Sequence, residues 1–424
     1  MSLNKEFIKT KYNDMLFLKS LCVGVFIWVF FYALTPVVAV SSISKDIIWF
    51  ILSNYIALIL GYYLTNDIIK KKTYVNFNSK NLEGFVKVIF ILILFSSVVR
   101  FIDLFFIREV SFFNSISSNK YNLAQEDKFS ITLGILSFFR LLYFVPYLFY
   151  VVEKKKKKKL IVLCLLLFLI PITEGFLRGS RRLIFEPIGI LITIICVYNF
   201  SKLLSKKIIL MTIVVSIFSV FISNFILKER IHESRNKEFL EKIYVAPYND
   251  LLPLKSETQE FLLQNNSSWI GKATFTLVHI GQYMLHGVYE FDYLYKLNPV
   301  KRKGMYNGFI IVKLLNKLNL SNISLDFLTN PTKRVTYITF FGGLYLDFGW
   351  FSLIIMLFFG AFQKVIFQYS YHIRYLKPLL IVLVFSNAFL LVFNFLRAGL
   401  IVFFLIYLMF LFLFYNRKKL LKYI

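Results

Sequence analysis

Three arginines stand close together in the segment GFLRGSRRLIFEP (175–187), which lies between two long apolar runs. They are Arg178, Arg181 and Arg182, and Glu186 follows one helical turn later. A guanidinium group stays charged and presents a planar fork of donors that matches phosphate and carboxylate groups. We therefore expect this turn to bind an anion, such as a lipid head group. The alternative is that these side chains only extend from helix ends toward the membrane interface.

The composition indicates a membrane protein. Hydrophobic residues make up 58% of the 424 residues, and the mean hydropathy is +0.66, whereas soluble domains are about 45–50% apolar. Runs of about 17 to 25 apolar residues recur along the chain, and each is long enough to cross a bilayer. The three cysteines lie inside such runs, so the sequence predicts neither a disulfide framework nor a cysteine metal site.

We predict an all-α polytopic membrane protein with about ten transmembrane helices. A count of eleven or twelve remains open. The spans are placed at 18–38, 47–64, 85–107, 131–152, 160–176, 183–200, 208–226, 347–367, 378–393 and 399–415. The chain would then consist of an N-terminal membrane bundle (1–226), a large outer loop with interfacial helices (227–345) and C-terminal spans (346–424).

Lysines indicate the orientation of these spans. They gather in alternate short loops, including an unbroken run at 154–159. The positive-inside rule places these loops and both termini in the cytoplasm. This distribution accounts for the net charge of +27 without a nucleic-acid partner, and the lysine run would at most contact anionic membrane lipid. Most arginines, including Arg334 and Arg397, then fall on the outer side.

Several charged residues lie within the predicted spans. Arg100 and Asp103 are three positions apart, so they share a helix face and can pair. Arg140 lies in the middle of the fourth span, and Glu186 lies one turn inside the sixth. Charge at such depth is costly, and it is found where helices enclose it or where it lines a wet cavity. A purely structural ion pair, for example between Asp103 and Arg140, is the alternative to a functional role.

The large loop contains a segment, SSWIGKATFTLVHIGQYMLHGVYEFDYLYKLNP (267–299), that reads as an amphipathic helix lying along the outer interface. His279 and His286 are seven positions apart on one face, and Glu290 follows one turn later. This spacing does not match a metal-binding motif. A histidine or a carboxylate here could act as a general acid or base, or could simply form hydrogen bonds at the interface.

Taken together, these features resemble the Wzy-type O-antigen and capsule repeat-unit polymerases of bacteria. Three features carry the resemblance: the GSRR turn (179–182), the large loop before the last three spans, and GGLYLDFGWFSLIIMLFFGAF (342–362), which opens a late span. The resemblance implies a GT-C-like glycosyltransferase of the bacterial cytoplasmic (inner) membrane. It implies no cofactor and no metal, and partners such as a flippase and a chain-length regulator.

Such enzymes polymerise undecaprenyl-diphosphate-linked oligosaccharide units at the outer leaflet into O-antigen, as in lipopolysaccharide, or into capsular polysaccharide. The resemblance assigns diphosphate binding to Arg178, Arg181 and Arg182, and extends it to Arg334 and Arg397. Cations suit this role because the departing diphosphate carries negative charge.

The acceptor hydroxyl needs a base or an orienting acceptor, for which His286, Glu290 and Glu186 are candidates in that order. An O-antigen ligase-like transferase and a lipid-linked oligosaccharide flippase or other transporter remain the alternatives. A transporter would favour two similar halves, which this sequence does not show.

Overall fold

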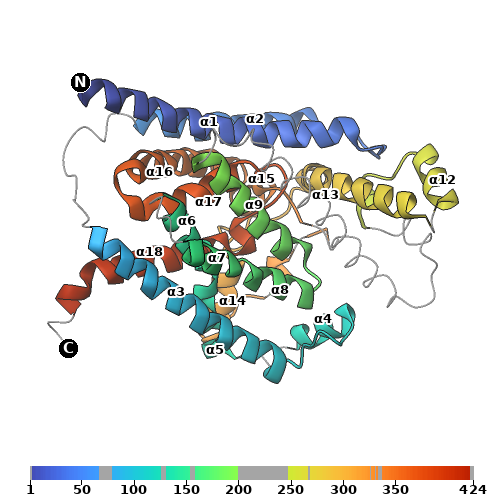
Figure 1. The fold of residues 1–424 in the computed structure, drawn as a ribbon. Helices are drawn as coiled ribbons and strands as arrows, with labels where there is room; N and C mark the ends of the chain where they lie inside the picture. Colours follow the sequence, from blue (N-terminus) through green and yellow to red (C-terminus); the bar gives the residue numbers. More distant parts are fainter. Residues whose placement is uncertain are drawn as a thin grey trace. The chain divides into compact units, whose positions relative to one another are not determined.

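The computed structural model describes residues 2–65, 79–125, 130–152, 158–198, 247–265, 268–324, 326–329, 331–332 and 337–420. These residues form helices and connecting turns, with one isolated β-bridge between Val37 and Leu254. Figure 1 draws these helices, coloured along the sequence. The chain divides into two compact units. Unit 1 comprises Met1–Val75 and Glu238–Ile401, and unit 2 comprises Asn76–Lys237 and Val402–Ile424.

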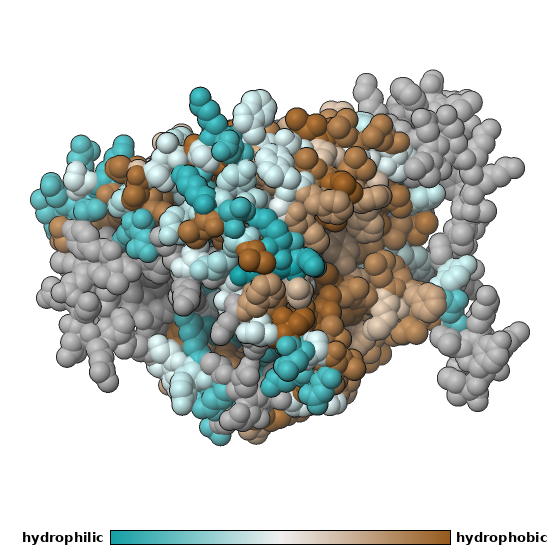
Figure 2. Space-filling view, turned by 180° about the vertical axis from the view of Figure 1, so that it is seen from behind, coloured by the Kyte–Doolittle hydropathy of each residue, from teal (hydrophilic) through white to brown (hydrophobic). Residues whose placement is uncertain are grey.

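Six helical segments are long and apolar enough to cross a membrane, among the residues that the structure describes. They are Asp14–Leu34, Lys45–Leu64, Leu82–Ile107, Ile131–Val152, Lys159–Leu177 and Phe340–Ser370. Large hydrophobic side chains such as Phe26, Trp49 and Phe358 are exposed on these segments, and Figure 2 shows a broad hydrophobic area on one face. The chain is therefore an all-helical polytopic membrane protein.

Some of the roughly ten predicted spans are not among these six helical segments. The prediction at 378–393 is wrong, because α17 (Lys377–Asn387) has only 11 residues before the chain turns. α9 (Arg181–Tyr198) begins with two arginines and is not among the six. α18 (Ile401–Leu420) contains a shorter apolar stretch, Ile401–Asn416. The predicted span at 208–226 lies outside the described residues.

Unit 1 is centred on a tight pair of helices, α2 (Lys45–Leu64) and α16 (Ser352–His372). A Cβ atom added at Gly61 would lie 1.9 Å from the carbonyl oxygen of Leu357, and one added at Gly360 would lie 2.1 Å from that of Leu58. Glycines at both positions thus allow the two backbones to touch, as in small-residue packing between membrane helices.

Hydrogen bonds between buried polar side chains also join the helices of unit 1. Asn387 of α17 exchanges two hydrogen bonds with Gln363 of α16, at 2.8 and 3.0 Å, and donates to Ser20 of α1 (Ser2–Leu34) at 3.1 Å. Lys364 of α16 pairs with Asp14 of α1 at 2.7 Å. In an apolar environment such bonds hold helices in register.

The segment predicted as an interfacial amphipathic helix is the helix α13 (Trp269–Leu297). Ser268 caps the start of α13 by accepting a hydrogen bond from the Gly271 amide. The helix ends before Asn298, which adopts a left-handed conformation. The eight consecutive residues 285–292 are all buried. Because eight residues cover every side of a helix, α13 lies inside unit 1, and the prediction of a one-sided helix is wrong.

Unit 1 further contains three short helices, α12 (Ser256–Gln264), α14 (Phe309–Lys317) and α15 (Phe340–Phe348). Thr339 caps α15 by accepting from the Gly342 amide. Gly349 then breaks the chain between α15 and α16 with φ 56° and ψ −136°, a conformation that essentially only glycine adopts. The predicted span at 347–367 therefore begins earlier, at Phe340, and contains this break.

Unit 2 is built around α3 (Ser79–Ile102), which continues through a wide π-turn at Asp103–Ile107. Phe85 packs against Phe149, Tyr407, Phe410 and Phe414. The remaining helices are α4 (Ile116–Ala124), α5 (Ile131–Leu136), α6 (Val145–Val152), α7 (Lys158–Leu166), α8 (Leu169–Leu177), α9 and α18, with a 3-10 turn at Ser137–Leu142.

The two units do not follow the predicted three-part division at 226 and 345. That division separated membrane spans from a loop, whereas the units group helices that pack together, so each unit draws on two distant stretches of chain. The side of the membrane on which the predicted loop lies remains a prediction.

Candidate functional site

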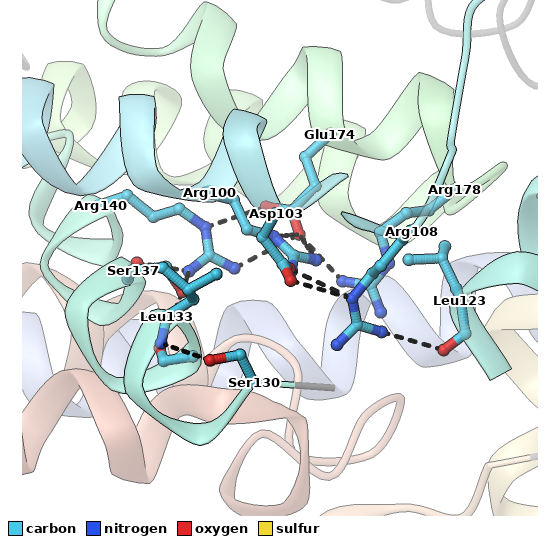
Figure 3. A network of polar contacts seen from close by, with 11 residues as sticks. Arg100, Asp103, Arg108, Leu123, Ser130, Leu133, Ser137, Arg140, Glu174 and Arg178 are labelled. Carbon is cyan, nitrogen blue, oxygen red and sulfur yellow. Dashed lines mark hydrogen bonds and ion pairs between the residues drawn. The ribbon is translucent and has the colours of Figure 1, made fainter. Parts of the chain in front are cut away.

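A network of buried charges in unit 2 is centred on Glu174 of α8 (Figure 3). Its carboxylate accepts hydrogen bonds from Arg100 at 2.7 and 3.0 Å, from Arg140 at 3.0 and 3.3 Å, and from Arg178 at 3.1 Å. The Glu174 side chain is only 4% exposed. Three arginines from three separate parts of unit 2 thus converge on one carboxylate.

Asp103 extends the network along α3 (Figure 3). It pairs with Arg100 at 2.6 Å, which confirms the predicted pair three positions apart, and with Arg108 at 3.2 Å. The π-turn allows the second contact, because the Arg108 amide bonds to the Asp103 carbonyl five residues back. The suggested pair between Asp103 and Arg140 is wrong, since Arg140 bonds to Glu174 instead.

Four guanidinium groups therefore surround two carboxylates, Asp103 and Glu174. Among the residues that the structure describes, arginines outnumber carboxylates in this network. Arg178 is its most accessible arginine, with a side chain 40% exposed against 8 to 15% for the other three. An anion would reach the network most readily at Arg178.

Local backbone geometry explains why Arg178 stands at this edge. α8 ends at Leu177, and Gly179 adopts φ +57°. The Ser180 amide bonds to the Gly175 carbonyl at 2.8 Å, and the Arg178 amide bonds to the Glu174 carbonyl at 3.0 Å. A left-handed glycine after a helix closes it in this way and reverses the chain, so α9 returns along α8.

Arg181 and Arg182 occupy the first turn of α9. Arg182 pairs with Glu186 at 3.5 Å, and both side chains are about one third exposed, at 34% and 29%. Glu186 is followed by Pro187, which lies inside the helix. The four sequence-predicted residues Arg178, Arg181, Arg182 and Glu186 thus lie close in the chain and share unit 2.

The other candidate residues lie in unit 1. His286 and Glu290 are fully buried on α13, with 3.7 Å between Nε2 and the nearer carboxylate oxygen. Thr332 donates to Glu290 at 2.5 Å. His279 and His286 both pack against the Tyr248 ring, at 5.1 and 5.0 Å between centroids, so they share a helix face as predicted.

Arg397 also belongs to unit 1, in a π-turn at Leu396–Leu400. Its Nη1 donates to the Tyr306 carbonyl at 2.8 Å, and its guanidinium lies 4.0 Å from the Tyr306 ring centroid. Burial raises the pKa of the Tyr306 phenol, and Arg397 and Arg302 oppose this rise. The predicted diphosphate ligand Arg334 lies outside the described residues.

Asp347 fixes the turn that carries Tyr306. One oxygen accepts from the Tyr306 amide at 2.8 Å, and the other accepts from the amide and side chain of Asn307 at 2.9 and 2.7 Å. Asn394 donates to the Asn307 side chain at 2.6 Å. Gly343 makes room for this contact, since a Cβ there would lie 1.9 Å from Asn394 Nδ2.

Replacing Asp347 with asparagine is expected to lower the free energy of unfolding by about 2 to 4 kcal/mol, because an amide would place a donor against buried N–H groups. Thermal unfolding followed by tryptophan fluorescence would measure the loss, since Trp28, Trp49, Trp269 and Trp350 all belong to unit 1. Asp46→Asn at the exposed start of α2 is the control, with an expected loss below about 1 kcal/mol. Equal losses in both variants would contradict this role for Asp347.

Sequence reasoning missed the residues that organise both clusters. Glu174 was not singled out from the sequence, and Asp347 entered only as the first residue of the predicted span at 347–367. An acidic residue inside an otherwise apolar run indicates that a partner lies nearby in the fold, because a buried carboxylate needs a cationic or hydrogen-bonding group. Across the described ranges, no group of three or more histidine, cysteine, aspartate or glutamate side chains could hold a metal ion.

No known protein family model, curated protein or solved structure matches this chain. The candidate site therefore rests on its own geometry, which is an arginine-rich network in unit 2 whose most accessible described arginine is Arg178.

Proposed function

We propose that the chain is a membrane glycosyltransferase that polymerises undecaprenyl-diphosphate-linked oligosaccharide units into O-antigen or capsular polysaccharide. The observation that supports the proposal is the arginine-rich network around Glu174, whose most exposed arginine is Arg178. The resemblance of the GSRR turn to the turn of repeat-unit polymerases supports the same assignment.

The network suits a step in which a sugar–diphosphate bond breaks. The oxygen of the acceptor hydroxyl bonds to the anomeric carbon while the bond between that carbon and its phosphate oxygen breaks. The hydroxyl proton passes to a base, and the diphosphate leaves with an additional negative charge. Arg178 would bind this group, with Arg181 and Arg182 beside it on α9. Arg100 and Arg140 hold Glu174 in place and so fix the position of Arg178. Preorganised cations in a poorly solvated site stabilise developing charge without having to reorganise.

Glu186 is the candidate acceptor-orienting group that shares unit 2 with these arginines. Its side chain is 29% exposed, which would allow contact with an acceptor hydroxyl. His286 and Glu290 are 0% exposed, and this burial favours a packing role for them in unit 1. We therefore propose Glu186 ahead of His286 and Glu290 as the residue that orients the incoming hydroxyl.

Arg178→Lys is expected to shorten the surface glycan and to reduce polymer output roughly 10- to 100-fold, because lysine keeps the charge but loses the planar fork. The measurement is the glycan ladder on a denaturing gel, in cells whose own copy is deleted and replaced by each variant at matched expression. Arg374→Lys is the control, since Arg374 is exposed in a turn of unit 1.

The ladder also separates the alternatives. Single-unit caps after deletion support a polymerase, whereas loss of all surface glycan would indicate a flippase or a ligase-like transferase. The Arg178–Glu174 contact is partly exposed, so its loss should cost below about 1 kcal/mol, and Arg178→Lys should remain folded. An unchanged ladder in this variant would reject the arginine site.

A further inference from the structure

A second arginine cluster lies in unit 1, around Tyr306. The Arg397 guanidinium lies 4.0 Å from the Tyr306 ring centroid and 4.5 Å from that of Phe309. The Arg302 guanidinium lies 5.4 Å from the same Tyr306 ring and 5.3 Å from the Phe327 ring. Two guanidinium groups that come from residues 95 positions apart thus share one aromatic ring.

The nearby carboxylate, Asp347, attracts both arginines electrostatically, but no direct ion pair joins it to them among the described residues. Both oxygens of Asp347 already accept hydrogen bonds from the amides of Tyr306 and Asn307. Within the described ranges, neither Arg302 nor Arg397 forms an ion pair with a carboxylate. The two arginines instead donate to backbone carbonyls, Arg302 to Thr329 at 2.5 Å and Arg397 to Tyr306 at 2.8 Å.

Arg302 has donor capacity that remains unused. The residue is only 5% exposed, and its buried Nε has no hydrogen-bond partner among the described residues. A buried charged donor without an acceptor is unfavourable, and a second guanidinium close by adds repulsion. An oxyanion between them would satisfy Nε and offset this repulsion.

We propose that Arg302 and Arg397, aligned by Tyr306, form a binding site for a phosphate-type oxyanion in unit 1. Both arginines belong to unit 1, whereas the Glu174 network belongs to unit 2, and the proposal does not depend on the chain being a transferase. Phosphate fits because its oxygens can accept from the planar donor forks of two guanidinium groups, whose two positive charges exceed the one negative charge of Asp347. The same chemistry is offered by soluble phosphate and by an anionic lipid head group.

Hydrogen bonds hold the backbone around the two arginines in place. Asp347 holds the turn of Tyr306, and the Arg302 and Lys303 amides bond to the carbonyls of Leu346 and Asp347 at 2.9 Å each. Arg397 is half-buried and Phe327 is 37% exposed. The anion could therefore approach past Phe327 and Arg397, while Arg302 lies deeper.

The first test is the thermal unfolding of purified full-length protein in uncharged detergent, followed by tryptophan fluorescence. Inorganic phosphate replaces chloride at constant ionic strength. We expect phosphate to raise the melting temperature of the wild type, with an apparent affinity at least tenfold weaker in Arg302→Lys and Arg397→Lys. Arg397→Gln replaces Arg302→Lys if the buried substitution prevents cooperative unfolding. Arg374→Lys, also in unit 1, should respond like the wild type.

The second test identifies the source and the location of the anion. The protein is placed in nanodiscs of phosphatidylcholine, with or without phosphatidylglycerol, and its melting temperature is measured. If phosphatidylglycerol raises the melting temperature of the wild type but not that of Arg397→Lys, the site binds a lipid head group. Arg178→Lys should still be stabilised by inorganic phosphate or by phosphatidylglycerol as the wild type is, because Arg178 belongs to unit 2. The proposal is overturned if neither anion stabilises the wild type, or if Arg178→Lys loses a response that Arg397→Lys retains.

Discussion

Glu174→Gln is expected to lower the free energy of unfolding by about 3 to 5 kcal/mol, the usual cost of removing one partner from a buried ion pair. Glutamine would keep the shape of the side chain but remove the charge that holds Arg100, Arg140 and Arg178 together. Among the described residues, the four guanidinium groups would then have only the Asp103 carboxylate to share. Their mutual repulsion in a poorly solvated site should separate α3 from α8.

Far-ultraviolet circular dichroism during heating would measure this effect, because the tryptophans report on unit 1 and not on unit 2. A melting temperature lower by roughly 10 °C is expected. Glu186→Gln is the matched control, since its pair with Arg182 is longer, at 3.5 Å, and partly exposed, and its loss should cost below about 1 kcal/mol. Similar melting temperatures for the two variants would show that Glu174 does not organise the network.

Adding one methyl group at the α2–α16 contact is expected to destabilise unit 1. In Gly61→Ala and Gly360→Ala the new Cβ atoms would lie 1.9 and 2.1 Å from backbone carbonyl oxygens. A backbone atom cannot rotate away as a side chain can, so the helices must move apart. We expect each variant to lose about 1 to 3 kcal/mol of unfolding free energy, as for other overpacked cores.

Gly84→Ala gives the same substitution at a helical glycine with no atom within 4 Å of the new Cβ. Alanine favours the helix there, so this variant should be neutral or up to about 1 kcal/mol more stable. Tryptophan fluorescence on heating would follow unit 1 for the Gly61 and Gly360 variants, and circular dichroism would follow Gly84→Ala. The packing argument fails if all three alanine variants shift stability in the same direction.

The first membrane helices could be predicted closely from the sequence. The predicted spans at 18–38, 47–64 and 85–107 correspond to Asp14–Leu34, Lys45–Leu64 and Leu82–Ile107. These segments are long, apolar and bounded by charged residues, so hydropathy alone defines them. The spacing of residues along a helix also predicted correctly that Arg100 pairs with Asp103 and that His279 and His286 share a helix face.

Contacts between distant parts of the chain could not be predicted. The partner of Arg140 is Glu174, 34 residues later, and that of Arg100 is the same carboxylate, 74 residues later. A single sequence does not show which of several charged residues meet when helices pack. The predicted site also joined Arg178 with His286 and Glu290, which belong to different units.

The environment of α13 was misjudged for a related reason. Its many tyrosines and polar residues suggested a helix half in water. The structure instead surrounds it with rings, since Tyr283 packs against Tyr337 and Phe393, and Phe291 packs against Phe50. Polar residues can be buried when neighbouring groups accept their hydrogen bonds, as Asn249 and Leu252 do for Gln282. Hydropathy does not report on such partners.

The close contact between α2 and α16 has a consequence for biosynthesis. About 290 residues separate the end of α2 from the start of α16, so a ribosome adding about 5 to 20 residues per second needs roughly 15 to 60 s to make the second helix after the first. During this interval the glycine face of α2 has no α16 to cover it. Lipid or an assisting membrane protein must occupy that face, and a nascent chain that stalls before α16 would leave α2 available to pair with the wrong helix.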